Sequence, residues 1–240
     1  MPLLAWIINR AANAQLVDTI VVATPDSEEN APIWQFLDKA PVRLVRGDEQ
    51  DVLSRVLKAA HETRTDLIVE LTGDCPLIDP EIIDACVGYY ICGNGGQRTY
   101  EAWHFVGNCK PRTWPRGMDV RVFSTKTLER CDSEVRGDAR EAYWREHVSP
   151  WIYERTDSQY SCLNIAADDQ LTHPELNLSV DTWDDYRRVK GVIDDLGAGN
   201  PLFTCKDILE NLAALPGYET LTMPQLEKDA SWLHDLRSIA

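Results

Sequence analysis

Apolar residues recur along the first 90 residues at the spacing of helices and, between these stretches, in short β-branched runs. Residues 2–14 place leucine, isoleucine and alanine on one helical face, and residues 19–24 form a β-branched run that ends before Pro25. The pattern predicts helices at 2–14, 28–39 and 50–62 and from residue 80, and strands at 19–24, 42–45 and 66–71. Such alternation is typical of a parallel sheet covered by helices on both faces.

The pattern changes after residue 90. Residues 91–116 are rich in glycine, arginine, tryptophan and polar groups, which predicts an irregular segment. Beyond it the pattern predicts strands at 117–123, 159–165 and 175–180 and helices at 139–154, 183–196 and 204–214. Thr182 and Asp185 fit a capping box at the start of one of these helices. We expect a single α/β domain over residues 1–214 and an appendage over residues 215–240.

The charge balance excludes some partners. The 240 residues carry 24 Lys and Arg against 39 Asp and Glu, a net charge of −15, which argues against nucleic acid and against an anionic membrane surface. The seven cysteines show no disulfide framework and no zinc spacing. The chain start has neither a basic leader nor a long apolar run. We therefore expect a cytoplasmic protein with reduced thiols.

Several common catalytic motifs do not occur in the sequence. A P-loop, a GxGxxG dinucleotide motif, a GxSxG nucleophile elbow and an HExxH zinc motif are all missing. This argues against a P-loop nucleotidase, a serine hydrolase and a zinc protease.

Two carboxylates follow predicted strands. Asp74 comes after the strand at 66–71, and Asp181 directly follows the strand at 175–180. Ligands of α/β sheets bind beyond the carboxyl ends of strands, and two carboxylates with substrate phosphate oxygens suit Mg²⁺. The alternatives are a plain turn residue for Asp74 and a helix-terminus carboxylate for Asp181.

Three other stretches carry candidate chemistry. The segment 110–119 holds Arg112 and Arg116, whose guanidinium groups suit carboxylates and phosphates, although a solvated basic loop is an alternative. His147 lies in a predicted helix, where a histidine is often structural. Asp51 is placed to cap the helix at 50–62, with Arg55 one turn later, so capping competes there with ligand contact.

In their order and spacing these stretches resemble the cytidylyltransferase family that makes CMP-activated acidic sugars, and within it the spore-coat polysaccharide branch. The matching segments run from residue 2 to about residue 212 and are 20–24, 46–48, 51–55, 72–78, 112–119, 145–150 and 180–182. The resemblance implies a Rossmann-like nucleotidyltransferase fold of the glycosyltransferase-A type. Its sheet would be mixed and mainly parallel, with helices on both sides.

The resemblance also implies a reaction, in which CTP and a sugar acid give a CMP-sugar and pyrophosphate. Asp74 and Asp181 would hold Mg²⁺, and Arg112 and Arg116 would lie near the sugar carboxylate or the phosphates. His147 would lie near the sugar. The predicted substrate-binding residues, all within the matching segments, are Arg112, Arg116, Asp119, His147, Asp51 and Arg55. A homodimer is the assembly that the family suggests.

The chain departs from the family pattern in two places. The family opens with a strand and a nucleotide-binding loop, and Met1 corresponds to the helix after that loop. We therefore expect the strands at 19–24 and 66–71 to flank a gap or to close onto each other, and the 240-residue chain to be inactive. Arg121 stands where this branch usually carries an acidic residue.

Two other functions remain open. A glycosyltransferase would share the fold, but its common Asp-x-Asp metal motif does not occur in this chain. A non-catalytic or vestigial protein that binds a nucleotide or a sugar would follow from loss of the loop.

Overall fold

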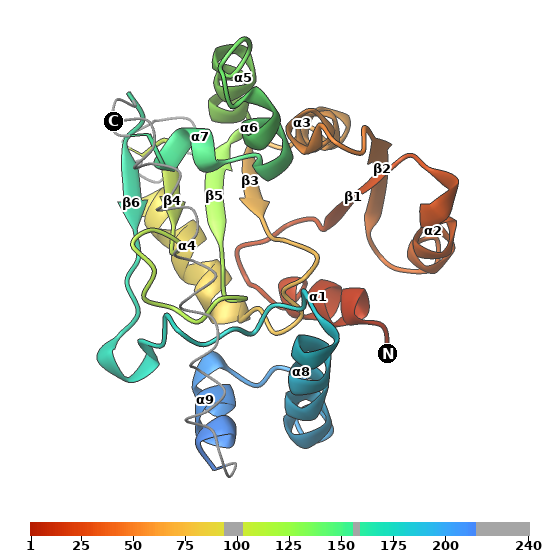
Figure 1. Cartoon of the computed structure of the whole chain (residues 1–240), viewed down its shortest axis with the longest axis vertical. Helices are drawn as coiled ribbons and strands as arrows, with labels where there is room; N and C mark the ends of the chain where they lie inside the picture. Colours follow the sequence, from red (N-terminus) through yellow and green to blue (C-terminus); the bar gives the residue numbers. More distant parts are fainter. Residues whose placement is uncertain (94–102, 156–158, 215–240) are drawn as a thin grey trace.

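The computed structural model describes residues 1–93, 103–155 and 159–214 (Figure 1). The α-helices in these residues are α1 (Leu3–Ala11), α2 (Ala31–Leu37), α3 (Val52–Thr63), α4 (Pro80–Gly93), α5 (Thr125–Glu134), α6 (Glu141–His147), α7 (Pro150–Tyr153), α8 (Trp183–Leu196) and α9 (Cys205–Ala213). The strands are β1 (Val21–Pro25), β2 (Arg43–Gly47), β3 (Leu67–Glu70), β4 (Phe105–Gly107), β5 (Arg121–Ser124) and β6 (Cys162–Asn164). Two 3-10 helices complete the set, η1 (Glu28–Asn30) and η2 (Asp169–Leu171).

The strands form two separate sheets. β1 and β2 pair in parallel, and the other four strands follow the order β3-β5-β4-β6. In the larger sheet β5 runs antiparallel to both of its neighbours, and β4 and β6 are parallel. The predicted mixed α/β architecture is confirmed, and parallel and antiparallel pairings occur in equal number.

A gap separates the two sheets, as expected. In the described residues β1 pairs only with β2, and β3 pairs only with β5. Figure 1 shows the two sheets set apart, and residues of α1, β1, α3 and β3 line a cavity of about 840 Å³ in this region. The strands predicted at 19–24 and 66–71 therefore flank a gap and do not close onto each other.

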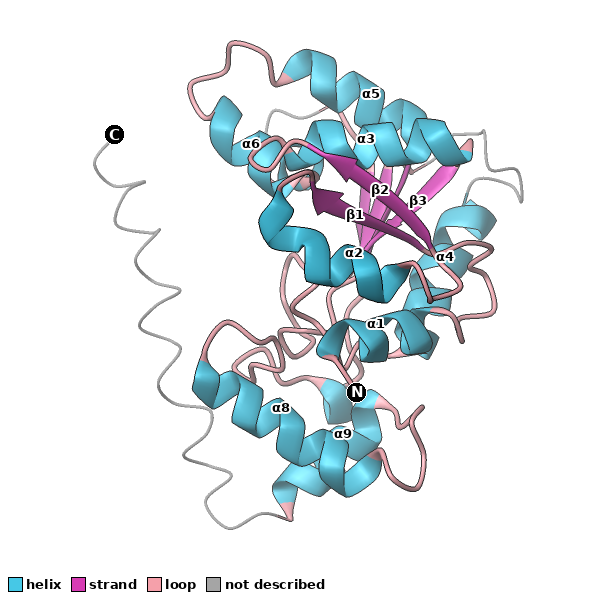
Figure 2. Ribbon diagram, turned by 90° about the vertical axis from the view of Figure 1, so that its right-hand side faces the viewer, coloured by secondary structure: helices cyan, strands magenta, loops and turns pink. Residues whose placement is uncertain are grey.

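The apolar core lies on both faces of the larger sheet because neighbouring residues of a strand point in opposite directions. Val106 and Val122 join one cluster with side chains of α1, α4, α8 and α9. Phe105 and Phe123 join a second cluster with α3, α5, α6 and α7. Figure 2 shows α3, α5 and α6 on one side of the strands and α1, α8 and α9 on the other.

Several predicted elements need correction. The strand expected at 175–180 is wrong: its only sheet contact among the described residues is an isolated bridge from Asn177 to Arg116. The helix expected at 139–154 is two helices, because Val148 adopts φ 67° between them. The segment expected to be irregular contains β4, and α5 was not predicted.

The other elements agree with the predictions to within a few residues. Among the described residues, no helix has the length and apolar character needed to cross a membrane. The appendage predicted for residues 215–240 lies outside the described residues.

Candidate active site

The two predicted metal ligands lie on neighbouring stretches of backbone. After β3 the chain turns through Thr72 and Gly73 to Asp74, and the backbone N–H of Val180 donates to the Asp74 carbonyl oxygen at 2.9 Å. Asp181 follows, exposed, and its Oδ2 accepts a hydrogen bond from Ser179 Oγ at 3.0 Å. The structure therefore brings together two backbone segments that are far apart in the sequence, and each of them carries one of the two candidate carboxylates.

These two residues offer oxygen ligands only. Among the described residues, no group of three or more His, Cys, Asp or Glu side chains is placed to hold a metal ion. A site built on Asp74 and Asp181 would therefore need further ligands from substrate or water, which is the way Mg²⁺ is commonly held.

The basic segment reaches the same region through a tight backbone contact. The Arg116 N–H donates to the Leu176 carbonyl at 2.9 Å, and the Leu178 N–H donates to the Arg116 carbonyl at 2.7 Å. Gly117 has φ 98°, and a Cβ there would lie 2.6 Å from the carbonyl carbon of Leu178. Only glycine fits this close approach, which places Arg116 beside the segment that leads to Asp181.

Arg112 and Asp119 hold each other. Arg112 donates from Nη1 to Oδ1 at 2.6 Å and from Nη2 to Oδ2 at 2.8 Å, a bidentate pair. Burial alone would raise the pKa of Asp119, but the guanidinium groups of Arg112, Arg121 and Arg116 lower it below its usual value. The structure thus places Arg112 in an internal ion pair, where it positions the segment.

The start of α3 confirms the capping prediction. Asp51 accepts a hydrogen bond from the Ser54 N–H at 3.0 Å. Its carboxylate also forms an ion pair with Arg145, whose Nη1 lies 2.9 Å away. The buried Arg55 turns back to donate to the carbonyl oxygens of Asp48 and Glu49. Burial lowers the pKa of Arg55. Asp51 is engaged in capping, whereas Arg55 lines the cavity.

His147 is the last residue of α6 and is exposed. Its ring packs edge-on against Tyr143, with 4.5 Å between the ring centroids. His147 lines the cavity between the sheets, together with Arg55, Thr72 and Gly73.

The cavity wall also carries an ion pair that the sequence prediction missed. Arg121 Nη1 lies 3.2 Å from Glu70 Oε1, and the two residues are direct partners across β3 and β5. Burial raises the pKa of Glu70, although the charge of Arg121 opposes the shift. The signal that would have found Glu70 is a charged residue at the end of an otherwise apolar strand.

An α/β fold with carboxylates and arginines at strand ends suits anionic, phosphate-bearing ligands. The chain belongs to the cytidylyltransferase family, whose model matches residues 1–187. This family is the one that the sequence motifs indicated.

Similar proteins come from several organisms. The chain is 29% identical to the uncharacterized protein MJ1063 of Methanocaldococcus jannaschii over 185 residues, which cover 77% of this chain and 70% of that protein. It is 28% identical to the spore coat polysaccharide biosynthesis protein SpsF of Bacillus subtilis over 180 residues, 75% of this chain and 69% of SpsF. A shorter match, 33% over 86 residues, relates 36% of the chain to 33% of a 3-deoxy-manno-octulosonate cytidylyltransferase of Pelobacter propionicus.

The fold is also that of a solved structure. A cytidylyltransferase from Leptospira borgpetersenii superposes with a TM-score of 0.80 at 28% identity, over 94% of this chain and 87% of that one. The nucleotidyltransferase fold expected from the sequence is thereby confirmed.

Proposed function

We propose that this protein transfers CMP from CTP to an acidic sugar, with release of pyrophosphate, for surface polysaccharide or glycan biosynthesis. Family membership supports the cytidylyl transfer. The names of two relatives, a spore coat polysaccharide protein and a 3-deoxy-manno-octulosonate cytidylyltransferase, support the sugar side. The sugar hydroxyl would attack the α-phosphorus of CTP, with pyrophosphate as the leaving group.

One contact supports this proposal above the others, the hydrogen bond from Val180 N–H to the Asp74 carbonyl oxygen. It joins the segments that carry Asp74 and Asp181, and these are the residues that would hold Mg²⁺. Their hard oxygen atoms fit that ion, which when bound balances charge on the phosphates. Arg116, whose backbone is hydrogen-bonded to the segment that leads to Asp181, would add a cation.

The remaining residues act mainly by position. Arg112 and Asp119 fix the basic segment, and Asp51 fixes the start of α3. His147, which the family resemblance places near the sugar, and Arg55 line the cavity between the two sheets. Catalysis of this kind depends on orientation and electrostatics, with no covalent intermediate on the protein.

The test is pyrophosphate release from CTP with Mg²⁺ and a panel of sugar acids. It is run on the 240-residue chain and on a version extended upstream. Asp74→Asn and Asp181→Asn are expected to lower kcat at least 100-fold in the active form. Asp184→Asn is the matched control, since its exposed carboxylate pairs only with Arg187 in the described residues.

The outcomes separate the candidate functions. Pyrophosphate release that depends on Asp74 and Asp181 supports cytidylyl transfer. Release that survives both substitutions refutes their assigned role. CTP binding without release in either form favours a binding protein, and hydrolysis of a nucleotide-sugar without CTP turnover favours a glycosyltransferase. The homodimer and the cytoplasmic location stay predictions.

A further inference from the structure

The carboxylate of Asp181 rests on a buried hydroxyl group. Asp181 is exposed and forms no ion pair within the part of the chain that the structure describes. Ser179, two residues earlier, is only 2% exposed. Its Oγ lies 3.0 Å from Asp181 Oδ2 and 2.7 Å from Asn177 Oδ1. One buried donor therefore faces two acceptor oxygens.

The Asn177 side chain decides where the hydroxyl proton is needed. Its Oδ1 already accepts the backbone N–H of Ser179 at 3.0 Å, and its Nδ2 faces Asp185 Oδ1 at 3.4 Å. These two contacts set the amide in one orientation. Because Asn177 Oδ1 is satisfied by the backbone, the single proton of the Ser179 hydroxyl group can be donated to Asp181 Oδ2.

The backbone of Asp181 is held as well. Its N–H donates to Asp185 Oδ2 at 3.3 Å, and the N–H of Val180 donates to the Asp74 carbonyl oxygen at 2.9 Å. Asp181 Oδ1, by contrast, has no hydrogen-bond partner among the described residues. One oxygen of this exposed carboxylate is thus held, and the other is left open to a ligand.

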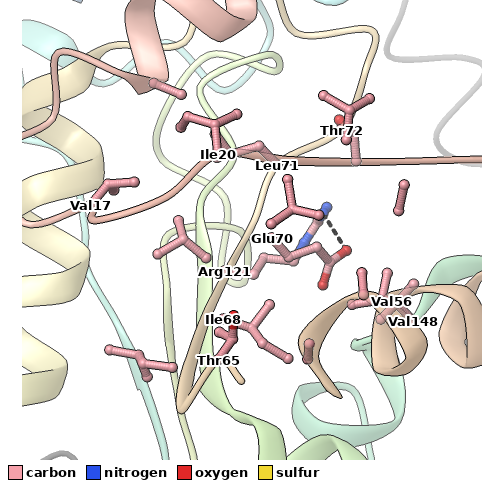
Figure 3. Close-up of a pocket in the computed structure, with 18 of the residues that line it drawn as sticks. Val17, Ile20, Val56, Thr65, Ile68, Glu70, Leu71, Thr72, Arg121 and Val148 are labelled. Carbon is pink, nitrogen blue, oxygen red and sulfur yellow. Dashed lines mark hydrogen bonds and ion pairs between the residues drawn. The ribbon is translucent and has the colours of Figure 1, made fainter. Parts of the chain in front are cut away.

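Asp74 shows the same arrangement on the neighbouring segment. The chain leaves β3 through Thr72, which Figure 3 shows at the cavity wall, and reaches Cys75, which is 4% exposed. Thr72 Oγ1 lies 3.1 Å from Cys75 Sγ, and the thiol donates weakly to Asp74 Oδ1 at 3.6 Å. Asp74 Oδ2 has no partner in residues 1–93, 103–155 and 159–214. In both segments a buried, uncharged donor holds one carboxylate oxygen.

Stability alone does not account for this arrangement. Water competes for an exposed carboxylate, so a hydrogen bond to it adds little to the free energy of unfolding. The contact does restrict the rotamers of the carboxylate, and such restriction favours binding because less freedom is lost when the ligand arrives. Carboxylates that bind metal ions are commonly held by hydrogen bonds of this kind.

We propose that Ser179 is a positioning residue for Asp181: its hydroxyl group holds Oδ2 and leaves Oδ1 for a divalent cation. This proposal rests on the proposed function, in which Asp181 holds Mg²⁺. The hydroxyl group itself touches neither substrate nor cation. Loss of a contact of this kind weakens metal binding about tenfold, which sets the expected size of the effect.

The test measures cation binding without turnover. Mn²⁺ takes the place of Mg²⁺, because its unpaired electrons broaden the ¹H–¹⁵N signals of nearby backbone amides in the full chain. We expect Mn²⁺ to broaden the signals of Val180 and Cys75 in the wild type, and Asp181→Asn to remove this effect. Ser179→Ala should need about ten times more Mn²⁺ for the same broadening.

Ser124→Ala is the matched control. Ser124 is also buried and its hydroxyl group caps α5, which lies on the other side of the strands from α8 (Figure 2). Both alanine variants lose a buried hydroxyl group and should melt a few degrees lower, but only Ser179→Ala should weaken Mn²⁺ binding. Ser179→Cys supplies the weaker thiol donor that Asp74 already has, so its Mn²⁺ affinity should lie between those of wild type and Ser179→Ala.

The outcomes separate positioning from structure. A folded Ser179→Ala protein that binds Mn²⁺ as tightly as Ser124→Ala overturns the proposal. Broadening no stronger at Val180 than beside the exposed carboxylates of Asp194 and Asp195 also overturns it, because Asp181 then holds no cation.

The positioning role and the proposed reaction can fail separately. In an active form, Ser179→Ala should need about ten times more Mg²⁺ for half-maximal pyrophosphate release, and saturating Mg²⁺ should restore most of kcat. Unchanged Mg²⁺ dependence there overturns the positioning role and leaves the reaction intact. If release fails with every sugar acid but Ser179→Ala still weakens Mn²⁺ binding, the proposed reaction is wrong and the positioning role stands.

Discussion

Replacing Asp119 with asparagine tests how firmly the basic segment is held. Asp119 contacts the guanidinium groups of Arg112 and Arg121, and its contact with Arg112 is bidentate, at 2.6 and 2.8 Å. The substituted side chain would keep the shape of aspartate and one acceptor oxygen. It would lose the negative charge and leave the arginines facing one another.

The expected loss of stability follows from these contacts. Removing one partner of a buried ion pair costs about 3–5 kcal/mol. The side chains of Arg112 and Asp119 retain 22% and 10% of their exposure, so solvent screens the pair in part. Because asparagine also retains one hydrogen bond, we expect Asp119→Asn to lower the free energy of unfolding by about 2 kcal/mol.

Urea unfolding at pH 7, extrapolated to water, measures this loss. The control is Asp184→Asn, whose side chain is 83% exposed and whose loss should stay under about 0.5 kcal/mol. The pKa of Asp119 is lower in the folded protein, so its ionised form stabilises the fold above its unfolded pKa. The difference between wild type and Asp119→Asn should therefore be constant above about pH 5 and shrink as the pH falls. An Asp119 variant as stable as the Asp184 control would refute this reasoning.

Three further predictions concern other parts of the chain. Arg10 is fully buried and donates to the carbonyl oxygens of residues 78, 201 and 203, so Arg10→Met should lower the free energy of unfolding, measured in urea, by about 3 kcal/mol. Gly117→Ala places a Cβ against the Leu178 backbone at φ 98°, and calorimetry should show a loss of about 2 kcal/mol or more. Cys75 is buried, which raises the pKa of its thiol, whereas Cys92 is exposed. A thiol reagent at pH 8 should therefore modify Cys92 at least 100 times faster, and equal rates would contradict the buried position of Cys75.

Local features of the fold could be predicted because neighbouring residues decide them. The Thr182–Asp185 capping box and the Asp51 cap form within one turn of helix, and both are present. The break at Val148 was missed because its strained backbone depends on tertiary packing. The strand expected at 175–180 failed because only Asn177 finds a strand-like partner, and a strand needs a neighbour along its length.

The candidate site, too, could be predicted from the sequence only in part. The residue types and their order indicated the family. The position of Asp74 after a strand made it a candidate metal ligand, which stays a prediction. The Arg112–Asp119 pair depends on how the segment turns at Gly117, and the pattern of single residues does not contain that geometry. Arg112 was therefore predicted to bind substrate, whereas in the structure it positions the basic segment 110–119.

The sequence by itself determined the family and the alternation of helices and strands, since these follow from motif order and local periodicity. It left open whether the strands at 19–24 and 66–71 flank a gap or close onto each other, and the tertiary structure shows the gap. Only the tertiary structure decided which charges face each other. Glu70 and Arg121 are 51 residues apart in the sequence and meet because β3 and β5 pair in one register. Burial then strengthens this ion pair, because charged side chains interact far more strongly away from water than in it.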